Sequence, residues 1–372
     1  MATVYLNIGT PKTGTTAIQS FLRENEALLN RLGYCFPELS PEVGIRGYKD
    51  RNGHFLICNA GSRYQYDEVI VRQKGFRAIE RLAGQYPNII LSDEELWKSA
   101  GKREGLWQQI DEEFRKIGCE MKVIVYLRRQ DLFIQSLWNQ NVKSKYMRRT
   151  ETFEECMEGN LFRYFPLNYY RHLSKMTKYL KKENIIVRPY EEGQFEGTEH
   201  SIFSDFLQCI GLNLTEAYTR ETVRSNPGLR GNFIEIKRII NGVPRYREIE
   251  DFMEKPLRMA NEYKVHNDLH AGRSMFASHE QQVEFLKKYE KSNRKVAKEF
   301  LGRENGKLFY DQVDELPAWK LEPDVMYRDL ILMVTEIFCQ QEQKIRELRR
   351  DVNRIAGSRV FRMMEKAARL IK

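Results

Sequence analysis

The segment Gly9–Thr16 contains the residue types that a phosphate-binding loop needs, namely two glycines, one lysine and several threonines. A short apolar run, Thr3–Ile8, precedes it, and Ala17–Leu29 follows with apolar residues at helical spacing. These flanks predict a strand and a helix. A loop between them would present backbone N–H groups to a phosphate at the positive end of the helix. The alternative is an ordinary strand-to-helix turn.

The loop matches the Walker A pattern GxxxxGK[ST] only in part. Gly9 and Gly14 have the spacing of its two glycines, but Thr15 stands where the pattern requires lysine. The lysine, Lys12, comes earlier, where it could reach a group beyond the bound phosphate. A P-loop kinase or NTPase also needs an acidic Mg²⁺ ligand after a strand, whereas the strand-like run Val123–Leu127 is followed by arginine.

The hexapeptide Pro11–Thr16 resembles the 5′-phosphosulfate loop of sulfotransferases that use 3′-phosphoadenosine 5′-phosphosulfate (PAPS). In that family the loop lysine contacts the sulfuryl group that is transferred, and the loop N–H and hydroxyl groups hold the 5′-phosphate. The resemblance implies the sulfuryl contact for Lys12. It implies cofactor binding for the other loop residues, Pro11, Thr13, Gly14, Thr15 and Thr16.

A second segment, Arg128–Ser136, resembles the 3′-phosphate element of this family, in which a strand ends in arginine and a serine follows eight residues later. The resemblance implies that Arg128 and Ser136 bind the 3′-phosphate. An arginine at the end of a strand and a serine on the next helix can also grip one phosphate on physical grounds. The Asn-Pro that is common after the arginine is missing, and Asp131 falls one place early, so no role is carried over to it. A surface arginine and an ordinary helical serine are the alternative.

Two further positions are weaker matches. The run Ile185–Glu191 resembles the strand that ends in Tyr-Glu in the family, which implies that Tyr190 contacts the adenine. A buried structural tyrosine is the alternative. Arg224, in Arg224–Gly228, occupies the place of a later nucleotide loop but lacks the Lys-Gly-rich pattern of the cytosolic enzymes.

Sulfuryl transfer is an in-line displacement at sulfur, and cationic donors near the leaving phosphate favour it, which makes Lys12 the main electrostatic group. The acceptor hydroxyl needs a general base, and the resemblance implies a His or Glu. We favour Glu94, which follows the run Asn88–Leu91, over His54. Ser92 and Glu95 also match a capping box, so Glu94 could be a simple helix-start acid.

No metal is predicted. The six cysteines form no CxxC pair, which argues against a structural zinc site and favours reduced thiols in a cytoplasmic protein. The histidines other than His54 show no metal-like grouping in the sequence, and surface or core roles are expected for them. They are His172, His200, His266, His270 and His279.

Strand-like runs alternate with helical stretches in the first half of the chain, which predicts an α/β fold with a central parallel sheet. The resemblance implies a P-loop-type three-layer arrangement. We expect strands at Thr3–Ile8, Asn88–Leu91, Lys122–Leu127 and Asn184–Val187. We divide the chain into an α/β core at 1–225, a helical acceptor or lid region of the same domain at 226–320, and a long basic amphipathic helix at 321–372.

The chain has 372 residues, of which 41% are hydrophobic and 30% charged, with a net charge of +9. Residues 343–372 hold ten Lys and Arg against three acids, so +7 of that charge lies in the tail and +2 in the rest. General nucleic-acid binding is therefore not predicted. The tail helix could lie on an anionic membrane surface or join two copies through Ile345, Leu348, Val352 and Ile355, spaced as a short heptad seam. No apolar run reaches membrane-span length, so we expect a cytoplasmic protein, peripheral on the inner membrane face in the first case.

These residues lead to three hypotheses. The first is transfer of a sulfuryl group from PAPS to a carbohydrate hydroxyl, leaving adenosine 3′,5′-bisphosphate (PAP). The segment Phe285–Phe309 resembles bacterial sulfotransferase-like proteins of polysaccharide synthesis, which implies lipopolysaccharide, capsule or another glycan, in some cases lipid-linked, as the acceptor. The second is a P-loop kinase or NTPase. The third is a catalytically degenerate scaffold with the same fold.

Overall fold

A computed structural model gives the structure of the chain. It describes residues 1–45, 49–57, 67–103, 105–163, 165–197, 199–220, 228–270, 273–313, 315–361, 363–364 and 367. Clustering of contacts divides the chain into two compact units. The first unit comprises residues 1–137, 153–227 and 278–315, and the second comprises 138–152, 228–277 and 316–372.

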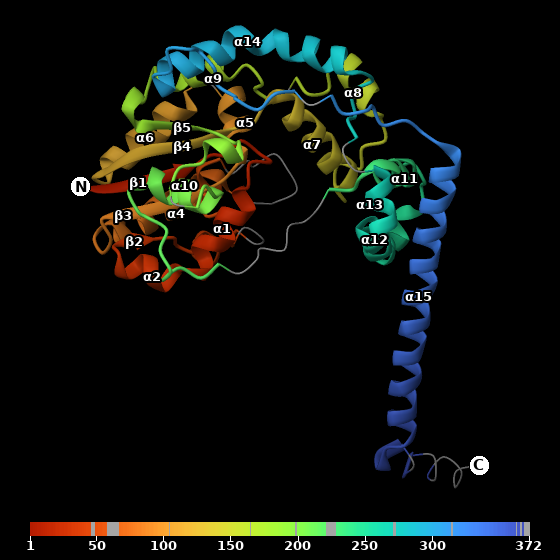
Figure 1. The fold of residues 1–372 in the computed structure, drawn as a ribbon. Helices are drawn as coiled ribbons and strands as arrows, with labels where there is room; N and C mark the ends of the chain where they lie inside the picture. The colour runs from red at the N-terminus through yellow and green to blue at the C-terminus, as the bar shows by residue number, and fades with distance from the viewer. Residues whose placement is uncertain are drawn as a thin grey trace. The chain divides into compact units, whose positions relative to one another are not determined.

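The first unit contains a five-stranded sheet in which every pair of neighbouring strands is parallel (Figure 1). The strand order is β2-β3-β1-β4-β5, so β1 lies in the centre. The strands are β1 (Ala2–Asn7), β2 (Tyr34–Cys35), β3 (Asn88–Ser92), β4 (Cys119–Leu127) and β5 (Ile185–Pro189). The α/β fold with a central parallel sheet is confirmed. The loop after β1 leaves the carboxyl edge of the sheet between the ends of β3 and β4, where α/β proteins bind ligands.

Helices cover both faces of the sheet because successive strand residues point to opposite sides. Val4 and Leu6 of β1 join one buried apolar cluster, and Tyr5 joins the other. Helices α4 (Glu68–Ala83), α5 (Glu95–Lys102), α6 (Leu106–Lys116), α9 (Tyr169–Met176) and α14 (His279–Leu301) contribute to the first cluster. Helices α1 (Thr15–Glu24), α2 (Glu26–Arg31) and α10 (Ile202–Cys209) contribute to the second. The result is three layers, as expected.

Shorter helices complete this unit. They are α3 (Ser40–Val43), α8 (Phe153–Glu158) and the 3₁₀ helices His54–Leu56, Lys182–Asn184 and Glu192–Gln194. Helix α7 (Gln130–Lys143) begins in the first unit and ends in the second. The helix expected at 17–29 is two helices, which meet at Asn25, and the short edge strand β2 was not predicted.

The second unit consists mainly of helices, with one isolated β-bridge between Ser274 and Ala318 among its described residues. Helix α15 (Pro323–Ala356) packs against α12 (Tyr246–Glu262) and α11 (Gly231–Asn241), and α13 (Lys264–His270) packs on α12. A long final helix is present, but it ends at Ala356, where Gly357 is the C-cap, and does not run to residue 372 as expected. Its seam residues Ile345 and Val352 are exposed. No helix among the described residues is long and apolar enough to cross a membrane.

The predicted domain limits need a correction. The helical region expected at 226–320 does not form one body, because residues 278–315 belong to the α/β unit and 228–277 group with the final helix. The physical reason lies in α14, where Val296 and Ala297 are buried in the same apolar cluster as the sheet.

Candidate functional site

Backbone hydrogen bonds place the loop after β1 beside the end of β4. The N–H of Thr10 donates to the carbonyl oxygen of Tyr126 at 2.8 Å, and the N–H of Tyr126 donates to that of Gly9 at 2.6 Å. Because β4 ends at Leu127, this pairing brings the loop next to Arg128. The Nη1 of Arg128 donates to the carbonyl oxygen of Lys12 at 2.9 Å. Two segments 116 residues apart, both predicted to bind the same cofactor, are therefore in contact.

The loop has the backbone conformation of a tight turn into a helix. Gly9 and Gly14 have φ of 91° and 73°, in the left-handed region that glycine adopts at little cost. A Cβ on Gly9 would lie 2.9 Å from the nitrogen of Pro11 and 3.2 Å from the Cβ of Glu94. Lys12 has φ of 70°, which is uncommon for a residue with a side chain. The N-cap residue of α1 is Gly14, which has no side chain with which to cap the first N–H groups of the helix, so these groups are open to a ligand.

Two cations meet at this loop without a carboxylate partner. Among the described residues, neither Lys12 nor Arg128 forms an ion pair, although both are partly buried. Burial lowers the pKa of Lys12, as does the nearby Arg128, while Glu94 acts in the opposite direction. Burial also lowers the pKa of Arg128. A cation taken from water without a partner is destabilising, so the pair forms a site that favours an anion.

Glu94 lies against the same loop. The Oγ1 of Thr15 donates a hydrogen bond to its carboxylate. Burial raises the pKa of Glu94, and the Thr15 hydrogen bond and Arg51 only partly offset this effect. A carboxylate with a raised pKa beside a cationic loop fits the role of a general base or acid.

The second candidate base, His54, is held by Asp93. The Nδ1 of His54 lies 2.9 Å from Oδ2 of Asp93, and Arg51 donates to Oδ1 at 2.6 Å. Burial would raise the pKa of Asp93, but the charges and hydrogen bonds of Arg51 and His54 hold it below its usual value. The sequence analysis missed Asp93 and Arg51; the acidic run directly after β3 was the available signal.

The predicted capping box at Ser92 is wrong. Ser92 is the last residue of β3, and its Oγ accepts a hydrogen bond from Nε2 of Gln19 at 3.0 Å. The N–H of Glu95 is capped by Oδ1 of Asp93 instead, at 2.8 Å. Ser92 cannot cap α5 because the strand continues through it and turns its side chain towards α1.

The structure brings Tyr190 to the same loop. A Cβ on Gly14 would lie 3.5 Å from its hydroxyl, and the guanidinium of Arg128 lies 5.8 Å from the centre of its ring. Ser136 is half-buried on α7, and no described contact joins it to Arg128. Arg224 lies outside the described residues.

The loop threonines differ in what they offer a ligand. The hydroxyl of Thr13 donates to the carbonyl oxygen of Thr10 at 2.5 Å, and that of Thr15 donates to Glu94. Thr16 is exposed at the start of α1, whereas Pro11 is buried. The hydroxyl of Thr16 and the loop N–H groups are therefore the groups best placed to reach a phosphate.

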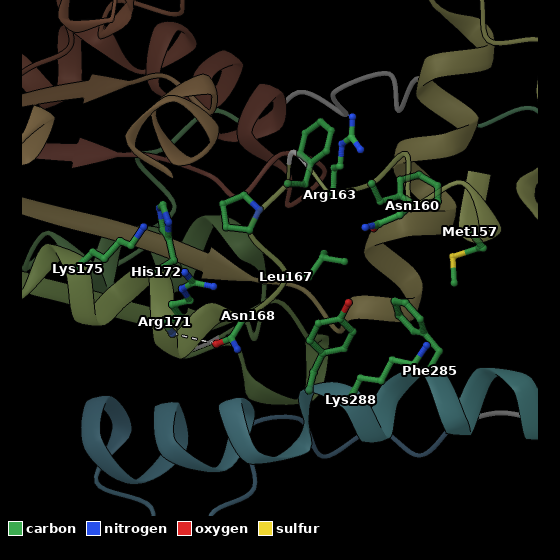
Figure 2. A pocket seen from close by; sticks show the side chains of 14 residues that line it. Met157, Asn160, Arg163, Leu167, Asn168, Arg171, His172, Lys175, Phe285 and Lys288 are labelled. Atoms are coloured by element: carbon green, nitrogen blue, oxygen red, sulfur yellow. Dashed lines mark hydrogen bonds between the residues drawn. The ribbon is translucent and has the colours of Figure 1, made fainter. Parts of the chain in front are cut away.

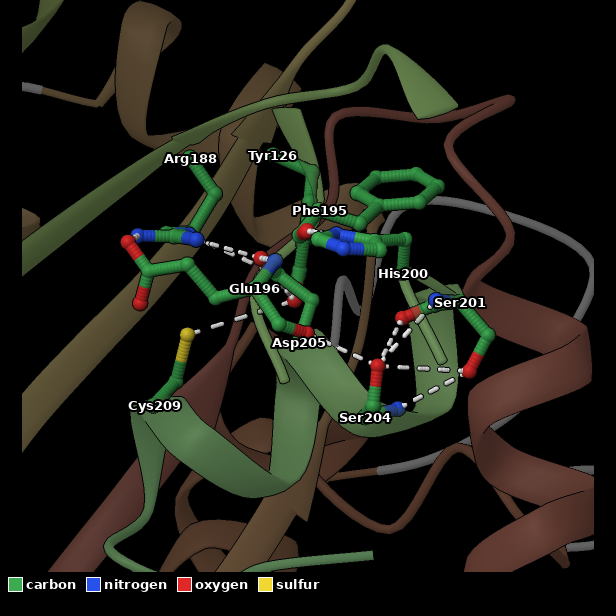
Figure 3. A network of polar contacts seen from close by, with 9 residues as sticks. All are labelled: Tyr126, Arg188, Phe195, Glu196, His200, Ser201, Ser204, Asp205 and Cys209. Carbon is green, nitrogen blue, oxygen red and sulfur yellow. Dashed lines mark hydrogen bonds and ion pairs between the residues drawn. The ribbon is translucent and has the colours of Figure 1, made fainter. Parts of the chain in front are cut away.

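A second polar network lies beside β4 and β5, and its charges are matched (Figure 3). Arg188 forms an ion pair with the buried Asp205 and another with Glu196 at 2.6 Å. The hydroxyl of Tyr126 donates to Oδ2 of Asp205 at 2.6 Å, and the N–H of Glu196 donates to Oδ1 at 2.7 Å. This network attaches α10 to the sheet, and its cation, Arg188, is already paired with two acids.

The second unit contains a buried cluster that the sequence analysis did not find. Nδ1 of His266 lies 3.0 Å from one oxygen of Asp329, and Nε2 of His270 lies 2.7 Å from the other. Burial raises the pKa of Asp329, but hydrogen bonds from both histidines outweigh this and lower it to about 2. The available signal was the spacing of four residues between the histidines, which places them on one face of a helix. The three groups could hold a metal ion, and their mutual hydrogen bonds explain their burial equally well.

Comparison with known proteins gives one relative to report. A protein of Archaeoglobus fulgidus, described as uncharacterized, is 30% identical over 210 residues. The match covers 54% of this chain and 54% of the archaeal protein, so the chain spans about half the length of that relative. No family model matches the chain. No solved structure matches it either.

Proposed function

We propose that this protein transfers a sulfuryl group from PAPS to a hydroxyl group of a carbohydrate. The observation that carries the proposal is the contact between Lys12 and Arg128, two partly buried cations without a carboxylate partner among the described residues. They lie beside the start of α1, where the N-cap residue Gly14 provides no capping side chain. A nucleotide with a 5′-phosphosulfate and a 3′-phosphate offers one anionic group to each part of this arrangement.

The residues present fit that nucleotide in charge and in backbone shape. The left-handed Gly14 and the first N–H groups of α1 suit the 5′-phosphate. Arg128 uses Nη1 on the carbonyl oxygen of Lys12, so the rest of its planar fork remains for the 3′-phosphate. Tyr190, against Gly14 and Arg128, offers a ring face to the adenine.

In the proposed reaction, PAPS supplies the sulfuryl group, and PAP leaves with its 5′-phosphate. Lys12 stabilises the negative charge that develops on the leaving phosphate oxygen. Glu94 accepts the proton of the attacking sugar hydroxyl as its oxygen bonds to sulfur. His54, fixed by Asp93, is the alternative proton acceptor.

A kinase or NTPase is the second candidate, because Asp93 and Glu94 follow β3 beside the loop, where such enzymes hold Mg²⁺. The contacts of Asp93 count against this role. Its two oxygens already accept from Arg51, His54 and the N–H of Glu95.

Calorimetric titration of the full chain with PAP and with ATP, each with EDTA and with Mg²⁺, tests the proposal. Metal-independent binding of PAP, tighter than that of ATP, is expected. Arg77→Ala, which removes an exposed arginine of α4, controls for a general loss of positive charge and should bind PAP like the native chain. Binding of ATP only with Mg²⁺ would establish the second candidate. Binding of neither nucleotide would point to the scaffold.

A further inference from the structure

A cavity of about 680 Å³ lies in the first unit between α9, α14 and the segment before α9 (Figure 2). Its volume falls in the range of small-ligand sites, roughly 300–1,000 Å³. Every residue that lines it belongs to the same compact unit as the sheet and the loop.

The lining of this cavity is basic. It includes Arg163, Arg171, Lys175 and Lys288, and it includes no Asp or Glu. Among the described residues, Arg171, Lys175 and Lys288 form no ion pair, and the ammonium of Lys288 lies 6.0 Å from the ring centre of Phe285. Positive charge concentrated around a concave, acid-free surface attracts an anionic ligand.

The cavity also offers groups that suit a sugar. Phe165, Phe285 and Tyr289 line it, and aromatic faces pack well on the C–H faces of sugar rings. His172 is buried, and its Nε2 has no hydrogen-bond partner among the described residues. Burial lowers the pKa of His172 to about 3, with the charge of Lys175 acting in the same direction, so the ring is neutral near pH 7. A neutral imidazole can exchange a hydrogen bond with a sugar hydroxyl.

One wall of the cavity packs on the elements of the proposed reaction site. The ring of His172 lies 4.0 Å from that of Trp97, which follows Glu94 by three residues. Tyr169, at the start of α9, meets Trp97 edge-on at 5.9 Å. The hydroxyl of Tyr169 donates to the carbonyl oxygen of Arg128 at 2.5 Å. The cavity is therefore built on the residues that follow the candidate base and on the arginine of the nucleotide site.

We propose that this cavity binds an acidic unit of the carbohydrate acceptor, a sugar carrying a carboxylate, phosphate or sulfate group. Arg171, Lys175 and Lys288 bind the acidic group, and the aromatic wall packs on the sugar ring. This inference rests on the proposed function and adds the class of acceptor to it. A neutral glycan would leave the three cations without partners, and the cavity would then give no selectivity.

The test compares two acceptor probes that differ only in charge, a hexamer of galacturonic acid and the same hexamer with its carboxyl groups reduced to hydroxymethyl. Calorimetry at low salt on the native chain should show the acidic hexamer binding at least about five-fold tighter. The preference should shrink as salt is added, because exposed charges are screened.

The variant Lys175→Ala/Lys288→Ala tests whether the acidic hexamer binds in the cavity. The variant Lys178→Ala/Lys291→Ala is its matched control. Each pair removes one exposed lysine on α14 and one on or just after α9, but Lys178 and Lys291 do not line the cavity. Exposed ion pairs contribute about 0.2–1 kcal/mol each, so the first pair should weaken binding of the acidic hexamer roughly five- to ten-fold. The control should stay within about two-fold of the native chain.

Three outcomes would overturn the inference. They are equal binding of the neutral hexamer, equal loss in the two lysine pairs, and tighter, lysine-dependent binding of a thymidine hexanucleotide. The affinity for PAP, measured in the same samples, reports separately on the proposed function. PAP binding without binding of the acidic hexamer would reject only the acceptor class. Lysine-dependent binding of the hexamer without PAP binding would reject the sulfotransferase proposal and retain the cavity as a glycan site.

Discussion

Two polar clusters beside β4 differ in whether their buried charged groups have ion-pair partners. Around Asp205, the buried acid has Arg188 and two further hydrogen-bond donors, so its charge is matched. Around the loop after β1, the guanidinium of Arg128 contacts the backbone of Lys12, and neither cation forms an ion pair among the residues that the structure describes. Matched buried groups hold a fold together, whereas unmatched ones reduce stability and are retained where a ligand supplies the missing charge.

The same contrast holds between two consecutive residues. Arg129 is buried, pairs with Asp131 at 2.8 Å and donates to the carbonyl oxygens of Asp311 and Gln312. Arg128, one position earlier, forms no ion pair among the described residues; it donates to the carbonyl oxygen of Lys12 and lies near the ring of Tyr190. Sequence reasoning could not have separated the structural role of Arg129 from the proposed binding role of Arg128 without the family resemblance.

The largest expected effect concerns the matched cluster. Asp205→Ala leaves the charge of Arg188 with one exposed partner and removes the acceptor of Tyr126. The free energy of unfolding should fall by about 3–5 kcal/mol, as when one partner of a buried pair is removed. Urea denaturation measures this. Glu196→Ala, which removes the partner of Arg188 that is 61% exposed, should cost less than about 1 kcal/mol. Equal losses in the two variants would remove the contrast between the clusters.

The next effect concerns the unmatched cluster, and it should separate activity from stability. Lys12→Ala should slow PAP formation from PAPS by on the order of 100-fold, as when one preorganised electrostatic donor is lost. Its stability should stay the same or rise, because a partly buried cation without an acid is removed. Lys74→Ala, an exposed lysine on α4, serves as the control. Loss of stability without loss of rate in Lys12→Ala would mean that the loop lysine is structural.

The smallest effect is a pH dependence of stability at Glu94. Its pKa is raised in the folded chain, mainly by burial, so the fold favours the protonated acid. The associated stability is present below the unfolded pKa and is lost as the pH rises through the folded pKa. Glu94→Gln should therefore melt higher than the native chain at pH 8, and the difference should vanish at acidic pH. A variant that melts lower at every pH would contradict the raised pKa.

The same variant distinguishes the two candidate bases. If Glu94 is the base, Glu94→Gln should abolish the rise of the PAPS reaction rate with pH, and His54→Gln should retain it. The reverse pattern would assign the base to His54, which Asp93 orients.

The central strands and the loop were predictable because they are local. A β-branched run such as Thr3–Ile8, followed by glycines and a helical pattern, specifies its own conformation within a few residues. The edge strand β2 was missed because two residues carry no periodicity. The unit boundary was missed because α14 joins the sheet through buried contacts far away in sequence, which no local pattern reports.

For the candidate site, the sequence identified the motif residues but not the side chains that hold them in position. The pairing of Lys12 with Arg128 follows from the register of β1 beside β4, which the family resemblance anticipated. Asp93 with Arg51, and His266 with Asp329, join segments 42 and 63 residues apart through single side chains. Nothing in the sequence around one partner specifies the other. The roles assigned to all of the site residues, and to the basic tail, stay predictions.

The most direct test of the central claim is a thermodynamic cycle between Arg128 and the 3′-phosphate. The affinities of the native chain and of Arg128→Ala are measured by calorimetry for PAP and for adenosine 5′-monophosphate, without divalent metal. A charge-assisted contact contributes about 1.5–3 kcal/mol, so the native chain should prefer PAP by roughly ten-fold or more. In Arg128→Ala the two nucleotides should bind about equally. A preference for PAP that survives the substitution, or no preference in the native chain, would contradict the assignment of this site.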